Sequence, residues 1–263
     1  MSFFSAKNIC TYYGKTQVLH NISFDLNSGE LLGILGSNGC GKTTLLKSLC
    51  GILPHEGFCT LHETTLEHCT PRQLARLCSY IPQRSGISID ISALDVVLMG
   101  FNPHLGLLEH PNTSMRQKAK QALALTGLGG KEQTNYMHLS EGQKQLCILA
   151  RTLVSDSRLL LLDEPESALD FHFRYQMLEI LQHWIKEQNG GAVVTLHDPV
   201  LALNYCDKLL LLSEGKVLDL ICPKTDPLDR MEHLLSRIYG TVSLHPCHDR
   251  KGNLQLLLMK EES

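Results

Sequence analysis

Short apolar runs alternate with helical periods along most of the chain. Nearly unbroken apolar runs lie at 30–35, 159–162, 191–196 and 209–212. Runs of this length without polar alternation are typical of strands buried on both faces of a parallel sheet. Helical periods follow at 44–49 and 171–186. The alternation predicts an α/β fold built on a mixed or parallel sheet.

The N-terminal part adds strands of a different kind. Extended patterns at 3–9 and 17–26 are joined by a short turn, and 57–62 is a further strand candidate. A short helix at 72–77 and a strand at 79–81 follow. We expect an antiparallel β subdomain beside the main sheet.

From 84 to 154 the pattern becomes helical. Ser92 followed by Asp95 is a helix-capping signal, and 113–125 has a helical period with charges on one face. This stretch predicts an inserted α-helical subdomain that interrupts a core formed by 1–83 and 155–222.

The last residues form a separate pattern. Prolines break the chain at 223 and 227, and apolar residues then recur at helical spacing from 231 to 238. Two apolar segments, 242–244 and 254–259, flank a turn at 250–253. We expect one domain at 1–222 and a small helix-plus-strand appendage at 223–263.

A phosphate-binding loop is predicted at Gly36–Thr44, between the first apolar run and a helical period. Its sequence fits G-x-x-x-x-G-K-[ST], in which backbone N–H groups surround a phosphate chain. Lys42 would reach the terminal phosphates, and the hydroxyl of Thr43 would bind Mg²⁺. The strand–loop–helix order also points the positive end of a helix at the phosphates. The segment predicts a site for a nucleoside triphosphate.

Acids and other polar residues follow three of the predicted strands. Asp163 and Glu164 end the most apolar run, His197 follows 191–196, and Gln83 follows 79–81. Ligands of such sheets bind at the carboxyl ends of the strands. Asp163 is therefore placed to hold Mg²⁺, and Glu164 to activate a water molecule.

Two features have both a structural and a functional interpretation. Ser140 and Gln143 form a capping box, and the helix N-terminus they cap is also an anion site. Tyr13 lies beside a glycine turn, where an aromatic ring is commonly a half-buried loop residue but can also stack on adenine.

Composition narrows the function. The net charge is −3 and we find no dense Lys/Arg block, which argues against nucleic acid as a partner. The ten cysteines form no C-x-x-C pair, and the N-terminus lacks a signal-peptide pattern, so we expect reduced thiols. The apolar runs are far shorter than the roughly 20 residues of a membrane helix. Any membrane span in the working assembly would belong to another chain.

The ordered motifs GSNGCGKTT, YIPQ, LSEGQ, LLLLDEP, SALD and TLHDP resemble those of the nucleotide-binding subunits of ABC transporters, over 3–220. The resemblance implies that two copies face each other and hold each ATP between the phosphate loop of one and the LSEGQ segment of the other. It implies Mg²⁺ ligation by Thr43, Gln83 and Asp163, with Glu164 as general base and His197 as the γ-phosphate contact.

The resemblance also implies the remaining contacts. The ATP contacts within one copy would be Tyr13, Gly36, Ser37, Asn38, Gly39, Cys40, Gly41, Lys42, Thr43 and Thr44. The partner copy would contribute Ser140, Glu141, Gly142 and Gln143. The loop across the interface would be Ser167, Ala168, Leu169 and Asp170.

The third residue of the signature departs from the usual LSGGQ, because Glu141 replaces a glycine. We expect its carboxylate to point away from the phosphates, which would otherwise repel it.

Local stretches at 97–108 and 195–218, together with the appendage, resemble ATPases that import iron-siderophore, haem or cobalamin chelates. The implied setting is a homodimer at the cytoplasmic face of a bacterial membrane, bound to polytopic permease subunits and served by an extracytoplasmic substrate-binding protein. The alternatives are an ATPase of another importer or of an exporter, or a non-transport ABC ATPase. A chromosome-organising ATPase would need long heptad arms, which are absent between 44 and 139.

Overall fold

The computed structural model describes residues 2–83, 86–106 and 108–261. Its largest sheet has six strands in the order β10-β9-β3-β8-β7-β6. Strands β9, β3, β8, β7 and β6 are parallel, and β10 is antiparallel to β9 at one edge. The strands are β3 (Leu31–Leu35), β6 (Cys78–Ile81), β7 (Leu159–Asp163), β8 (Gly191–Thr195), β9 (Lys208–Ser213) and β10 (Lys216–Ile221). The predicted mixed α/β sheet is confirmed.

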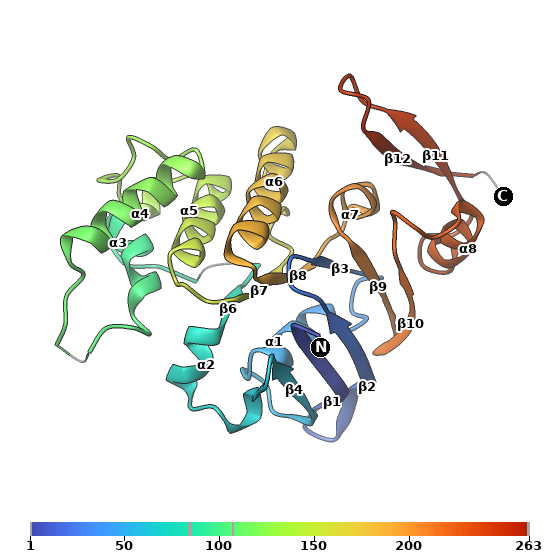
Figure 1. The fold of residues 1–263 in the computed structure, drawn as a ribbon, viewed down its shortest axis with the longest axis horizontal. Helices are drawn as coiled ribbons and strands as arrows, with labels where there is room; N and C mark the ends of the chain where they lie inside the picture. Colours follow the sequence, from blue (N-terminus) through green and yellow to red (C-terminus); the bar gives the residue numbers. More distant parts are fainter. Residues whose placement is uncertain (1, 84–85, 107, 262–263) are drawn as a thin grey trace.

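Alternate residues of the central strands face two different cores. Leu160 and Leu162 of β7 belong to a core shared with the helices above the sheet in Figure 1. Leu159 and Leu161 face a second core, shared with the N-terminal strands and the helix after the phosphate loop. Burial on both faces explains why these strands are uniformly apolar in sequence.

The second core is closed by the predicted antiparallel sheet, in the order β2-β1-β4-β5. Its strands are β1 (Phe4–Tyr13), β2 (Thr16–Leu26), β4 (His55–Leu61) and β5 (Thr64–Thr65). Helix α1 (Lys42–Leu49) lies between this sheet and the main one, as Figure 1 shows in blue. The phosphate loop at the start of α1 is thereby held between two sheets.

The helical subdomain is built from α3 (Ala93–Leu98), α4 (Thr113–Leu125) and α5 (Glu141–Leu153). The three helices pack on one another at the edge of the main sheet near β6 (Figure 1). Ser92 caps α3 by accepting a hydrogen bond from the N–H of Asp95, as its sequence predicts. On α4, Ala122 and Leu123 are buried in the core, whereas Leu125 at its end is half exposed.

The remaining helices connect these parts of the structure. They are α2 (Pro71–Leu77), α6 (Phe171–Gln188) and α7 (Pro199–Tyr205), with short 3₁₀ helices η1 (Leu66–His68), η2 (Met99–Phe101) and η3 (Tyr136–His138). Helices α6 and α7 cover the main sheet on the side opposite α1.

The C-terminal appendage contains α8 (Leu228–Tyr239) and an antiparallel hairpin of β11 (Val242–His248) and β12 (Leu254–Lys260). Asn204 of α7 donates to the carbonyl of Leu256 at 2.9 Å and accepts from its N–H at 2.8 Å. The hairpin is therefore attached to α7, at the red end of Figure 1. The boundaries at 84–154 and 223–263 stay predictions.

All ten cysteines are free thiols. Within the described ranges, no helix combines the length and the apolar character needed to cross a membrane.

Candidate nucleotide site

The loop Gly36–Gly41 joins the carboxyl end of β3 to the N-terminus of α1. A Cβ atom on Gly36 would lie 2.2 Å from the carbonyl oxygen of Leu212, so only glycine fits there. Gly41, the N-cap of α1, has φ of 109°, which side-chain-bearing residues rarely adopt. Gly36 lets the backbone of the loop lie close to the sheet, and neither glycine has a side chain that could cover the N–H groups of the loop.

Next to the loop, Lys42 begins α1 and is only 5% exposed, and its ammonium turns back to the loop. It donates to the carbonyl oxygens of Gly36 at 2.8 Å and Ser37 at 3.2 Å. The loop and Lys42 border a hollow of about 150 Å³, whose walls are Val18, Asn38, Gly39, Gly41, Lys42, Thr43, Thr44 and Glu164. A buried positive charge beside a helix N-terminus is an arrangement that suits a phosphate.

The side chains of two predicted ATP contacts, Cys40 and Tyr13, do not line the hollow. The thiol of Cys40 is buried beneath the loop next to Gly36, and burial raises its pKa. Only the backbone of Cys40 is therefore placed to contact a phosphate. Tyr13 ends β1 with its side chain half exposed, and it does not line the hollow.

Asp163 ends β7 and is held from three directions. Its Oδ1 accepts hydrogen bonds from the hydroxyls of Thr43 and Thr195, both at 3.0 Å. Its Oδ2 accepts from the hydroxyl of Tyr80 at 3.2 Å. Burial, and secondly the charge of Asp163, raises the pKa of Tyr80, so this phenol remains a proton donor. The carboxylate is thus fixed beside the first residues of α1.

Glu164 follows Asp163 in a left-handed conformation, with φ of 48°. The side chain of Thr195 holds this turn by accepting from the N–H of Glu164 at 2.8 Å. Oε2 of Glu164 accepts from Nε2 of Gln83 at 2.6 Å and pairs with Nε2 of His197 at 2.7 Å. Three residues that the sequence places at the ends of separate strands therefore meet at one carboxylate oxygen.

A second glutamate lies behind His197. Glu166 is 2% exposed, and its Oε1 accepts from the backbone N–H of His197 at 2.9 Å. Its other oxygen is buried without a hydrogen-bond partner among the described residues. Burial raises the pKa of Glu166. A protonated Glu166 carboxyl group would carry no charge, so no unpaired charge would be buried.

The segment 140–143 begins α5 and has the predicted capping box, in which Ser140 and Gln143 satisfy each other's backbone N–H groups. Glu141 is exposed and pairs with Lys144 at 2.7 Å. A Cβ atom on Gly142 would come within 3.0 Å of the carbonyl oxygen of Ala168, so the segment packs on the loop 167–170. These residues do not line the hollow at the phosphate loop.

Sequence reasoning missed Thr195, Tyr80 and Glu166. Thr195 and Tyr80 lie inside predicted strands, where threonine and tyrosine are ordinary residues. Glu166 follows the DEP motif, and its position within an acidic turn gave no signal of burial.

Comparisons with known proteins agree with this geometry. The profile of the ABC transporter family matches residues 19–167. The hemin import ATP-binding protein HmuV of Vibrio parahaemolyticus is 35% identical over 253 residues, which cover 93% of this chain and 95% of that protein. The Fe(3+) ions import ATP-binding protein FbpC 2 of Haemophilus influenzae is 34% identical over 224 residues, covering 84% of this chain and 62% of that protein.

Among solved structures, a metal-chelate type ABC transporter in an inward-facing conformation superposes with a TM-score of 0.83 at 28% identity. The match covers 99% of this chain and 98% of that chain, and so includes the appendage. The resemblance predicted from the sequence is confirmed, and the chain belongs to the ATP-binding, ATP-hydrolysing subunits of the ABC transporter family.

Proposed function

We propose that the chain couples ATP hydrolysis to the import of a metal chelate, of the iron-chelate or haem type, through separate membrane subunits. The observation that carries the chemistry is the single Glu164 oxygen contacted by both Gln83 and His197. The cargo class is supported by relatives that are named as haem and iron importers. The structural match to a metal-chelate type transporter along nearly the whole chain supports it further.

Glu164 is the general base in this proposal. Its side chain is 12% exposed, and the contacts of Oε2 with Gln83 and His197 fix its direction. His197, on the same oxygen, would contact the γ-phosphate as the resemblance implies. Hydrolysis of ATP needs little more than positioning and charge neutralisation, and this cluster supplies the positioning.

The phosphates of ATP would lie on the N–H groups of the loop 36–44, with Lys42 turning from its two carbonyl partners to the terminal phosphates. Tyr13 is exposed at the end of β1, which leaves its ring free to stack on adenine.

The oxygen atoms around Asp163 fit Mg²⁺. Thr43 offers a hydroxyl and Asp163 a carboxylate within 3.0 Å of each other, and Gln83 can add an amide oxygen. Hard oxygen ligands of this kind are those that Mg²⁺ prefers. When bound, the ion would neutralise charge on the phosphates.

A second copy of the chain would complete the site. The hollow of about 150 Å³ is smaller than the roughly 300 Å³ at which ligand pockets begin, so one copy cannot enclose a nucleotide. Ser140, Glu141, Gly142 and Gln143 lie outside it, at the exposed start of a capped helix that can offer N–H groups to another copy's phosphate. The loop 167–170, which contacts Gly142, would then lie at the interface.

The permease would be a polytopic membrane protein bound at the cytoplasmic face of a bacterial membrane, supplied by an extracytoplasmic substrate-binding protein. Named import functions of the relatives support these partners.

The test replaces Glu164 with glutamine, which keeps the hydrogen bonds but cannot take a proton. We expect Glu164→Gln to lower ATP turnover by roughly 10²–10⁴-fold, the usual contribution of a general base, and to leave ATP binding intact. The matched control is Glu187→Gln on the exposed side of α6, which should keep wild-type turnover.

Tagged Glu164→Gln protein should then be captured from native membranes with ATP and Mg²⁺, and its companions identified by mass spectrometry. A polytopic permease supports the proposal. Recovery of ribosomal or DNA-processing proteins instead would contradict transport, and unchanged turnover would contradict the role of Glu164.

A further inference from the structure

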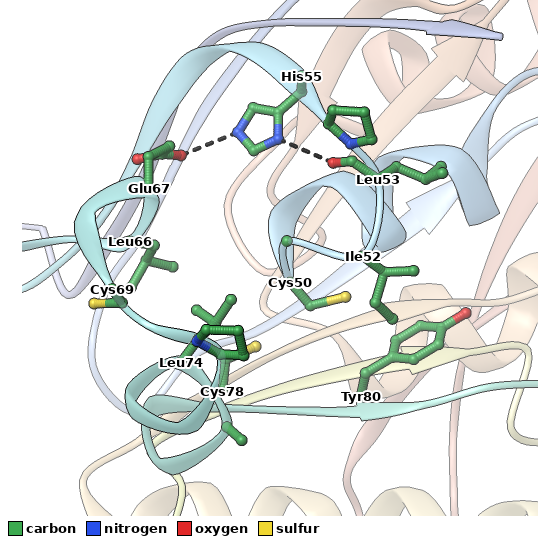
Figure 2. A pocket seen from close by; sticks show the side chains of 14 residues that line it. Cys50, Ile52, Leu53, His55, Leu66, Glu67, Cys69, Leu74, Cys78 and Tyr80 are labelled. Carbon is green, nitrogen blue, oxygen red and sulfur yellow. Dashed lines mark hydrogen bonds and ion pairs between the residues drawn. The ribbon is translucent and has the colours of Figure 1, made fainter.

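A large cavity opens at the end of α1 remote from the phosphate loop. It has a volume of about 590 Å³ and lies between the segment after α1, η1, α2 and β6. Figure 2 shows His55 and Glu67 on its rim, with Cys50, Cys69 and Cys78 around the wall. The proposed ATPase uses none of these side chains.

Beside this rim, the fully buried Cys59 comes close to His55 and Glu67. His55 and Cys59 belong to β4 and Glu67 to η1, and their ligand atoms all lie within 4.8 Å of one another. Nε2 of His55 is 3.0 Å from Oε1 of Glu67, and the imidazole is only 7% exposed. Cys59 is fully buried. The sequence spacing of the three matches no common metal motif, which is why the pattern did not reveal them.

The hydrogen bonds around the cluster orient its donor atoms. Nδ1 of His55 lies 3.4 Å from the carbonyl oxygen of Leu53, which can only accept, so the tautomer with its proton on Nδ1 would donate there and leave Nε2 free to bind a metal ion (Figure 2). Nε2 is consequently directed at Glu67. Oε1 of Glu67 is fixed in turn by the backbone N–H of Cys59 at 2.8 Å. Metal-binding histidines commonly donate their second ring N–H to a backbone carbonyl in this way.

We propose that His55, Cys59 and Glu67 form a binding site for a divalent transition-metal ion of the Zn²⁺ class. One nitrogen, one sulfur and one carboxylate oxygen are the ligand types that Zn²⁺ takes in proteins. Bonds of about 2.0–2.1 Å to nitrogen and oxygen give a tetrahedral N–O edge of roughly 3.3 Å. The observed 3.0 Å between Nε2 and Oε1 is close to that edge.

Binding would place the ion between Nε2 of His55 and Oε1 of Glu67. The Cys59 thiol would lose its proton as the sulfur–metal bond forms, and the partly exposed Glu67 carboxylate beside it would pass that proton to solvent. Three protein ligands leave one tetrahedral position for water. The ion would join β4 to η1 and so fix the segment that follows α1. If no ion binds, the same three residues are only a His–Glu ion pair beside a buried thiol. The experiment must distinguish this alternative from a metal site.

The probe is Co²⁺, because thiolate ligation to Co²⁺ gives a charge-transfer absorption that nitrogen and oxygen ligands do not. The metal-free full-length protein is titrated with Co²⁺, and Zn²⁺ is then added to displace it. Cys59→Ser and His55→Gln are the test variants, and Cys69→Ser, in the same cavity wall but outside the cluster, is the control. Circular dichroism checks that each variant is folded.

We expect one equivalent of Co²⁺ with the thiolate band in the wild type and in Cys69→Ser, displaced by one equivalent of Zn²⁺. The band should be absent in Cys59→Ser, and affinity should fall at least about tenfold in His55→Gln. Saturating Mg²⁺·ADP should leave the band unchanged, since none of the three ligands lines the hollow at the phosphate loop. A band that persists in Cys59→Ser, disappears with Mg²⁺·ADP, or is missing from the wild type would overturn the proposal.

Discussion

Single residues at the nucleotide site work through pairs of contacts. Thr195 contacts both acids of the DEP motif, through Oδ1 of Asp163 and the N–H of Glu164. Glu166 holds the backbone of His197 from a buried position. The direction of Glu164 therefore depends on a threonine and a second glutamate that the motif pattern does not distinguish from ordinary strand and turn residues.

The buried carboxyl of Glu166 should make stability depend on pH. Its folded pKa is raised from the ordinary 4.5, so the folded state holds a proton that the unfolded state releases. Stability is therefore lost as pH rises from the unfolded pKa through the folded pKa. Glu166→Gln keeps the acceptor for His197 but cannot ionise, so its stability should exceed that of the wild type increasingly as pH rises through this window.

Urea unfolding at several pH values between about 4 and 8 measures this difference. Exposed Glu63→Gln is the control and should follow the wild type. Parallel stability curves for Glu166→Gln and the wild type would show that Glu166 ionises normally.

At the scale of elements, α7 connects the site to the appendage. Its N-terminus follows His197 and is capped by Asp198, whose side chain accepts from Val200 and Leu201. Its other end carries Asn204, which holds both backbone groups of Leu256 in β12. One short helix therefore links the segment at His197 to the hairpin.

Asn204→Ala should detach the hairpin from α7. It removes two hydrogen bonds and leaves two backbone groups of Leu256 to water or to burial, at a cost of about 1–3 kcal/mol. Hydrogen exchange should speed up in β12 while β7 and β8 keep their protection. Asn253→Ala, at the tip of the same hairpin, is the control, because it loosens only the turn around Asp249. Unchanged exchange in β12 of Asn204→Ala would mean that packing alone holds the appendage.

Most elements could be predicted because their patterns are local. The uniformly apolar strand at 159–162 and the helix that begins after the Ser140 cap follow from burial and capping. Contacts between distant segments could not be predicted. Tyr80 reaches Asp163 only because β6 pairs with β7, and His55 reaches Glu67 only because η1 folds back beside β4. Neither contact corresponds to a recognisable spacing of residues in the sequence.

For the whole molecule, the central claim is that each catalytic site is shared by two copies. One copy presents a phosphate loop with Glu164 beside it and, away from this loop's hollow, an exposed helix start at Ser140. Closing two copies over ATP would bring these parts together, and release of the products would let them separate. This arrangement links hydrolysis to the movement of whatever membrane subunits the copies hold.

The most direct measurement is the ATPase activity of a mixture of two inactive variants. Lys42→Met removes the phosphate-binding charge. Ser140→Asp keeps an N-cap but places a negative charge against the partner's phosphate. Each variant alone should lose at least about 10²-fold in turnover. In a mixed dimer, both defects fall in one site and the other site is intact, so an equimolar mixture should recover about a quarter of wild-type activity. A mixture no more active than its two components would contradict a site shared between copies.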